Sequence, residues 1–172
     1  IFDFFTRYHN ECVQTPRDRL SIRDLKSLIA FIRCVRCPMS LSFIHGVLLT
    51  VIDGIGIGTQ SVSLQRRRDA LQIALDVIGD ESVRDQIDLV HCCIVMPNEF
   101  ITENRRFGLD PFWIGSGPNP SRSMPLSTSA PGTRRNLIRV LRALQLNKPV
   151  LLEGPPGAGN TSGGICSPVS DL

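Results

Sequence analysis

The feature that most constrains this 172-residue chain is a glycine-rich loop near its C-terminus. Residues 154–161 read Gly-Pro-Pro-Gly-Ala-Gly-Asn-Thr and follow a short apolar run at residues 150–152. A phosphate-binding loop has the pattern Gly-x-x-x-x-Gly-Lys-Ser/Thr between a strand and a helix. Gly154, Gly159 and Thr161 are in register with that pattern. The alternative interpretation is an ordinary glycine–proline turn.

Each part of this loop has a physical purpose. Glycines let the backbone adopt positive φ and approach phosphates closely, and successive N–H groups then form a nest for anions. The hydroxyl after the lysine position ligates Mg²⁺, a role that falls to Thr161 through the bound nucleotide. The sequence therefore predicts a site for ATP with magnesium, made of Gly154, Pro155, Pro156, Gly157, Ala158, Gly159, Asn160, Thr161 and Ser162.

The lysine position of the loop holds Asn160. An ammonium group about 4 Å from a phosphate charge contributes on the order of 4 kcal/mol at an effective dielectric constant near 20. That energy corresponds to about a thousandfold in binding or rate. Asparagine donates a hydrogen bond but carries no charge, so we expect ATP binding that is weak or lost, with little or no hydrolysis. No residue is assigned a catalytic role.

Both ends of the chain depart from a complete nucleotide-binding domain. Residues 163–172 contain two glycines and Pro168, where a helix with an apolar face would follow a working loop. This tail reads as an abrupt change of sequence, and we expect a mis-spliced end or a truncated gene model. The chain begins at Ile1 without an initiator methionine, so we expect it to start inside a longer one.

Hydrophobic periodicity predicts helices in the first half of the chain. Apolar residues recur at helical spacing over residues 21–34, 41–53 and 63–78, with a shorter helix or turn at 82–89. Ser21 followed by Asp24 resembles a capping box at the first of these helices. The glycines of residues 54–58 predict a helix stop and a flexible loop. The run of three arginines at Arg66, Arg67 and Arg68 is interpreted as a face exposed to water.

The second half is less regular. Residues 91–96 look like a short strand, and residues 107–132 are rich in Gly, Pro and Ser, as in a linker or an arm, with a possible extended piece at 112–114. From Thr133 onward a helix is predicted, with one face formed by Leu137, Ile138, Leu141 and Leu144. The run at residues 150–152 is of buried-strand type. The predicted fold is mainly α with a partial α/β piece: a helical bundle, an irregular linker, then a helix, a strand and the loop.

Composition excludes some classes of protein. No apolar run reaches the roughly 18 residues that a membrane span needs, so no membrane partner is expected. The net charge of +3 is too small to imply a polyanionic partner by itself. The six cysteines are interpreted as reduced thiols, because no secretory signal precedes them. Cys34 and Cys37 have the spacing of half a zinc site, but no second pair accompanies them, and buried thiols are the simpler interpretation.

The residues quoted so far carry a family resemblance. Residues 130–159 resemble the entry to an AAA module of the midasin family, the dynein-related ATPases with tandem modules in one chain, and residues 107–114 resemble the segment that leads into such a module. The first half resembles the helical lid that closes the preceding module. Residues 21–25 match its sensor-2 region, in which Arg23 is expected to reach the γ-phosphate. A solvated arginine in the first turn of a helix is the alternative for Arg23.

The resemblance implies an organisation and a role. Residues 1–90 would be the lid of one module, 91–132 a linker or arm, and 133–172 the truncated start of the next module. The family implies ATP-driven remodelling of pre-large-ribosomal-subunit particles in the nucleus, in nucleolus and nucleoplasm. The implied partners are neighbouring AAA modules of the same chain and the pre-ribosomal particle. This copy is expected to be impaired by Asn160.

Two alternatives belong to other classes of function. One is a noncatalytic structural linker module, or a truncated product without ATPase activity, which Asn160 favours. The other is nucleic-acid binding through a basic set consisting of Arg134, Arg135, Arg139, Arg142 and Lys148. Exposed arginines on a helix are usually only solvated, and no aromatic residue interleaves with these, so direct nucleic-acid binding is not expected.

Overall fold

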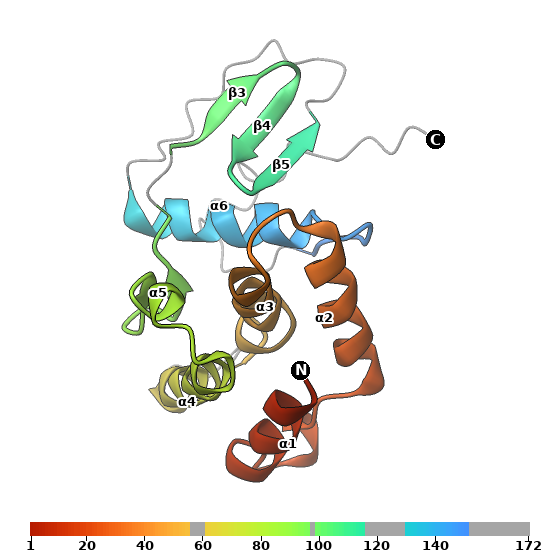
Figure 1. Cartoon of the computed structure of the whole chain (residues 1–172), viewed down its shortest axis with the longest axis vertical. Helices are drawn as coiled ribbons and strands as arrows, with labels where there is room; N and C mark the ends of the chain where they lie inside the picture. The colour runs from red at the N-terminus through yellow and green to blue at the C-terminus, as the bar shows by residue number, and fades with distance from the viewer. Residues whose placement is uncertain (56–60, 97–98, 116–129, 152–172) are drawn as a thin grey trace. The chain divides into compact units, whose positions relative to one another are not determined.

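The computed structural model describes residues 1–55, 61–96, 99–115 and 130–151 of the chain (Figure 1). The chain divides into two compact units, Ile1–Pro97 and Asn98–Leu172, each of which is described by itself. The first unit is a bundle of helices with one small hairpin, and the second combines a three-stranded antiparallel sheet with a helix. The prediction of a mainly helical fold is confirmed at this level.

The first unit begins with a helix that the sequence analysis did not predict, and its next three helices lie largely within the predicted ranges. Its elements are α1 (Phe2–Glu11), the 3-10 turn η1 (Pro16–Asp18), α2 (Ile22–Cys34), α3 (Met39–Val47), the π-helical turn η2 (Leu48–Ile52), α4 (Ser61–Ile78), α5 (Glu81–Arg84), β1 (Ile87–Asp88) and β2 (Cys93–Ile94). The predicted helix at 41–53 is therefore divided. It ends in a π turn, in which the amide of Asp53 donates to the carbonyl of Leu48, five residues back, at 2.8 Å.

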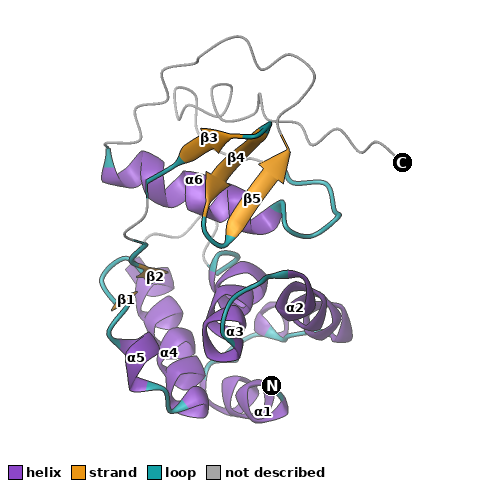
Figure 2. Ribbon diagram, turned by 45° about the horizontal axis from the view of Figure 1, so that its top comes forward, coloured by secondary structure: helices purple, strands orange, loops and turns teal. Residues whose placement is uncertain are grey.

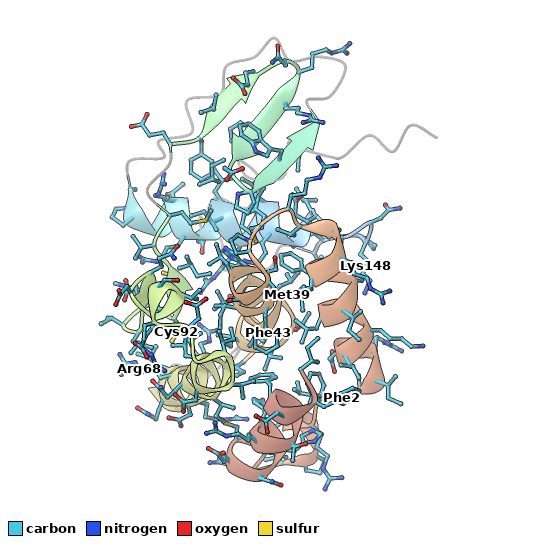
Figure 3. All side chains as sticks on the ribbon, in the orientation of Figure 1. Phe2, Met39, Phe43, Arg68, Cys92 and Lys148 are labelled. Carbon is cyan, nitrogen blue, oxygen red and sulfur yellow. The ribbon has the colours of Figure 1, made fainter. Side chains whose placement is uncertain are left out.

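The core of the first unit joins α1 to the bundle through aromatic side chains. Phe4 is fully buried and meets Phe43 of α3 edge to face, with ring centroids 5.8 Å apart. Phe43 is buried, whereas Phe2 and Met39, which are labelled with it in Figure 3, are both more than 70% exposed. α1 also packs on α4, and α2 packs on α3. The periodic apolar residues thus form one core, as the pattern predicted.

A turn around Asp88 ends the helical part of this unit. The carboxylate of Asp88 accepts from the amides of Val90 and His91 at 2.8 and 3.1 Å, and its other oxygen lies 2.7 Å from Nδ1 of His91. These contacts close the hairpin of β1 and β2, in which Ile87 pairs with Ile94. The helix or turn predicted at 82–89 is therefore a helix only as far as Arg84 and includes β1 further on, whereas the strand predicted at 91–96 is present in β2.

The second unit corrects the prediction of an irregular linker. Its strands β3 (Ile101–Glu103), β4 (Arg106–Leu109) and β5 (Phe112–Gly115) form an antiparallel meander in that order (Figure 2). Asn104 and Arg105 both have positive φ, at 48° and 59°, as in the two-residue turns that suit the twist of a hairpin. The extended piece predicted at 112–114 is the third strand.

Helix α6 (Pro131–Ala143) packs against β5 and completes the second unit. Its buried side includes Ile138 and Leu141, which are 6% and 1% exposed, and the amide of Gln145 donates to the carbonyl of Trp113 at 3.3 Å. Arg142 is also buried, contrary to the prediction that it lies on the exposed face. It follows Ile138 by four residues, so both positions lie on the same side of the helix.

The strand predicted at residues 150–152 is not found in the described part of the chain. Val150 and Leu151 belong to no strand, Leu151 is 80% exposed, and residue 152 lies outside the described ranges. Among those ranges no other strand of a parallel sheet is present to pair with this run, and an unpaired strand is not stable by itself. No helix within the described residues is long and apolar enough to cross a membrane.

Candidate functional site

The start of α2 carries Arg23, the sensor-2 candidate, and it is built from two capping boxes in succession. In the first box, the carboxylate of Asp18 accepts from the amide and hydroxyl of Thr15 at 2.8 and 2.9 Å. In the second, the carboxylate of Asp24 accepts from the amide and hydroxyl of Ser21, both at 2.7 Å. The second box confirms the predicted helix start.

The first box was missed at the sequence level, although Thr15-Pro16-x-Asp18 has the same spacing as Ser21-x-x-Asp24. Proline at the first helical position is a further signal for it. Together the two boxes fix the backbone on both sides of Leu20. Arg23 then follows in the first turn of α2, where its side chain is exposed.

Two side chains from other helices hold the segment between the boxes. Nε2 of His9, in α1, accepts a hydrogen bond from the amide of Leu20 at 3.0 Å. Arg66, in α4, forms an ion pair with Asp18 through its Nη2. Both partners of this pair are largely covered, with side chains 22% and 13% exposed. The approach to Arg23 is therefore attached to two neighbouring helices.

Electrostatics around this ion pair follow from the contacts. The hydrogen bond from Arg66 lowers the pKa of the Asp18 carboxyl to about 2, because the guanidinium stabilises the charged form. Burial raises the pKa of Tyr8 to about 12 and that of the Cys12 thiol to about 11, since burial disfavours the anion in each case. Cys12 is therefore held as an inert thiol beside the pair.

The lowered pKa of Asp18 predicts how the stability of the first unit depends on pH. Its folded-state pKa is depressed, so its contribution is complete above the ordinary value of 3.8 and is lost as the pH falls through about 2. Asp18→Asn should cost about 1–2 kcal/mol at pH 7 and should flatten the fall in unfolding free energy between about pH 4 and 2. Urea denaturation across that range measures both. Arg66→Met should flatten the same interval, and an unchanged slope in both variants would contradict the assignment.

The arginine run of α4 is not a solvated face, and that prediction is wrong. Besides Arg66, Nε of Arg67 donates to the carbonyl of Ile55 at 2.9 Å, and Nε of Arg68 donates to the carbonyl of Leu89 at 3.0 Å. All three side chains are partly buried. Each of the three arginines therefore holds a different loop or turn of the first unit against α4.

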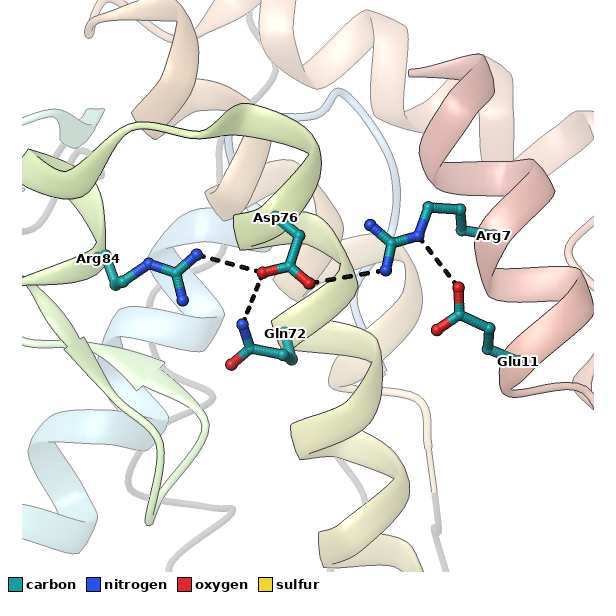
Figure 4. Close-up of polar contacts among 5 residues, drawn as sticks. All are labelled: Arg7, Glu11, Gln72, Asp76 and Arg84. Atoms are coloured by element: carbon teal, nitrogen blue, oxygen red, sulfur yellow. Dashed lines mark hydrogen bonds and ion pairs between the residues drawn. The ribbon is translucent and has the colours of Figure 1, made fainter.

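A second charged group joins α1, α4 and α5. The carboxylate of Asp76 accepts from Gln72 at 2.7 Å and from Arg84 at 3.2 Å, and it pairs with Arg7 at 3.6 Å (Figure 4). Arg7 in turn contacts Glu11 at 3.0 Å. These side chains are between about one third and one half exposed, so we interpret the group as structural support of modest strength.

The structure describes Arg23 of the predicted nucleotide-binding residues but not the phosphate loop. Residues 154–162, with Asn160 and Thr161, lie outside the described ranges. Of the described cysteines, Cys12 and Cys92 are buried and Cys34 is exposed. In the described part of the chain, no group of three or more His, Cys, Asp or Glu side chains is arranged to hold a metal ion.

The basic set of α6 is partly engaged within the second unit. The guanidinium of Arg134 lies 5.1 Å from the ring centroid of Phe100, which is itself stacked on Phe107 at 5.9 Å. This aromatic neighbour comes from outside the helix, so the helix sequence alone did not reveal it. With Arg142 buried, fewer of these cations are available to a phosphate backbone than the sequence suggested.

A shallow cleft on the first unit has the wrong chemistry for a nucleotide. It has a volume of about 280 Å³ and is lined by Ile1, Ile32, Met39, Ser40, Phe43, Val77 and Ile78. Ser40 is the one polar side chain among the described residues that line it, and none of these side chains carries a charge that would bind phosphate. Arg23 therefore remains the candidate functional residue of this unit.

Comparison with known proteins identifies the kind of chain this is. It is 34% identical to midasin of Dictyostelium discoideum over 166 residues and 27% identical to midasin of Giardia intestinalis over 162 residues. The matches cover 87% and 83% of this chain but only 3% of the length of either relative. No protein-family model and no solved structure matches it. Over more than four fifths of its length, the chain is a midasin-like segment.

Proposed function

We propose that this chain is the junction between two successive AAA modules of a midasin-like ATPase, where it contributes to ATP-driven remodelling of pre-large-ribosomal-subunit particles. In this role, residues 1–90 form the lid of one module and residues 133–172 begin the next. The observation that carries the proposal is the match to two midasins over most of the chain. Nuclear localisation and the pre-ribosomal partner belong to the same proposal.

The geometry around Arg23 supports the lid assignment. A residue that senses a γ-phosphate needs a free guanidinium on a backbone that is already ordered, since ordering it during binding would cost affinity. Arg23 is exposed, and the two capping boxes order the turn that presents it. In the proposed assembly its nucleotide is bound by the preceding module.

The loop at residues 154–162 would belong to the following module and bind ATP with magnesium only weakly. Asn160 removes the cation that normally faces the outer phosphates. Gly154, Gly159 and Thr161 retain the positions that shape the anion nest and reach the metal. In this proposal, the phosphate loop keeps the sequence pattern of the family but contributes little ATP hydrolysis.

A chimera tests the proposal. The matching segment of Dictyostelium midasin is replaced by this chain, and ATP turnover is measured with Arg23 intact or changed to alanine. Loss of a charged contact to a phosphate should raise KM for ATP about tenfold or more. Lys26→Ala is the matched control, because Lys26 is an exposed cation one turn further along the same helix. Equal KM values for the Arg23 and Lys26 variants would remove Arg23 from the nucleotide site.

The second candidate is a noncatalytic linker module that only holds neighbouring modules together, and Asn160 favours it. In that case, the chimera would support assembly of the particle with the same ATP dependence whether or not Arg23 is present. Nucleotide titration of the chain itself separates the two candidates further, through the lysine substitution argued below.

A further inference from the structure

Arg66 contacts a different part of the chain from Arg67 and Arg68, its two neighbours in the arginine run. Its Nη2 pairs with Oδ1 of Asp18, the last residue of η1, and α2 begins only a few residues later. The other carboxylate oxygen of Asp18 is occupied by Thr15. Asp18 thus connects the local capping box on one side to α4 on the other.

We propose that Arg66 is a positioning residue for Arg23. By holding Asp18 against α4, it fixes where the start of α2 lies and therefore where the guanidinium of Arg23 is presented. The proposal rests on the proposed function, in which Arg23 contacts the nucleotide of the preceding module. Arg66 itself is partly buried and acts only through the backbone between Asp18 and Arg23.

The physical basis is the attachment of one short segment from two sides. His9 of α1 holds the amide of Leu20, and Arg66 of α4 holds the carboxylate of Asp18. Without Arg66, the capping box of Asp18 remains closed, but η1 loses this link to the bundle. Displacements of about 1 Å in a group that orients a substrate can cost on the order of a hundredfold in rate, so a small shift of this segment matters.

Arg67 supplies a matched control within the same helix. It is also partly buried and also donates a hydrogen bond to another part of the first unit, at 2.9 Å. Its partner, however, is the carbonyl of Ile55, just after the π turn, which does not lead into α2. A purely structural role for the arginine run predicts similar consequences for Arg66→Met and Arg67→Met, whereas positioning of Arg23 predicts different ones.

The first test measures the segment directly in the full chain. Amide hydrogen exchange is followed at Leu20 and Ser21, whose N–H groups are bound by His9 and Asp24. Arg66→Met should reduce protection of both amides about tenfold or more, and Arg67→Met should leave them unchanged. Equal protection in the two variants would overturn the proposal. Methionine is chosen because it keeps most of the apolar stem of arginine.

The second test is a double-mutant cycle in the midasin chimera. Arg66→Met should raise KM for ATP about three- to tenfold, with a smaller effect on kcat. It should add nothing in a chain that already carries Arg23→Ala, and Arg66→Lys should recover part of the loss. If the changes in KM caused by Arg66→Met and Arg23→Ala are fully additive in the double variant, Arg66 does not act through Arg23.

The outcomes also separate this proposal from the one on which it rests. If Arg23→Ala impairs the chimera and Arg66→Met does not, positioning by Arg66 is wrong and the proposed function stands. If Arg23→Ala has no effect, the nucleotide-sensing role fails, and the positioning proposal fails with it.

Discussion

Replacing Gly108 by alanine should destabilise the second unit by about 3 kcal/mol or more. Gly108 has φ +155° and lies in β4, directly opposite Trp113 of β5. A Cβ atom there would overlap with the carbonyl oxygen of Phe112 and lie 3.1 Å from the Cα of Trp113. Because these are backbone atoms of the paired strand, no side-chain rotation can relieve the overlap. The strand pair would have to separate, and the buried Leu109 and Phe112 lie in it.

Gly115→Ala is the matched control for this substitution. Gly115 ends the same sheet, and a Cβ atom added there meets nothing within 4 Å, so its effect should remain within about 0.5 kcal/mol. Trp113 is the only tryptophan of the chain, and its fluorescence therefore reports on this sheet during urea denaturation. Gly108→Ala should lower the midpoint of that transition clearly. Coincident transitions for the two variants would show that the strands can accommodate the added carbon.

Local sequence signals predicted α2 and α4 well because the causes of these helices are local, although no helix was predicted at α1. Ser21 and Asp24 lie three residues apart, and their side chains close the box that starts α2. The apolar stripe that predicted a helix at 63–78 ends where α4 ends, at Ile78. In these cases capping and periodicity agree with the packing. The resemblance to midasins also depends on runs of sequence, and the comparison confirms it.

The failures have nonlocal causes. Arg66, Arg67 and Arg68 looked like an exposed charged face because their acceptors lie elsewhere in the chain, on Asp18, Ile55 and Leu89. The meander was predicted to be part of a linker because residues 107–132 are rich in Gly, Pro and Ser, whereas its strands depend on pairing between separate segments. Arg142 was misplaced because charge was given more weight than its position four residues after Ile138. The candidate site was predicted at Arg23, but the residues that hold its backbone were not.

Restoring the lysine of the phosphate loop is the second substitution with a large expected effect. Asn160→Lys should tighten ATP binding at least tenfold, from an affinity that is millimolar or weaker in the native chain. The Coulomb attraction of an ammonium for a phosphate sets an upper limit on the order of 4 kcal/mol. Isothermal titration of ATP with magnesium measures the change. Asn160→Gln is the control, because glutamine lengthens the side chain and keeps a donor without adding charge.

The affinities of the three forms for ATP show whether the loop lacks only the lysine charge or also lacks the backbone arrangement that binds phosphate. If only the charge is missing, the amides around Gly157 and Gly159 still form an anion nest, the lysine variant binds ATP, and the gain weakens as salt screens the interaction. If the backbone nest is also absent, lysine has no organised phosphate to meet, and the native, lysine and glutamine forms bind equally weakly. The second result would favour the linker module over an impaired ATPase. It would leave Arg23 as the only nucleotide contact proposed for this segment, serving a phosphate that another module binds.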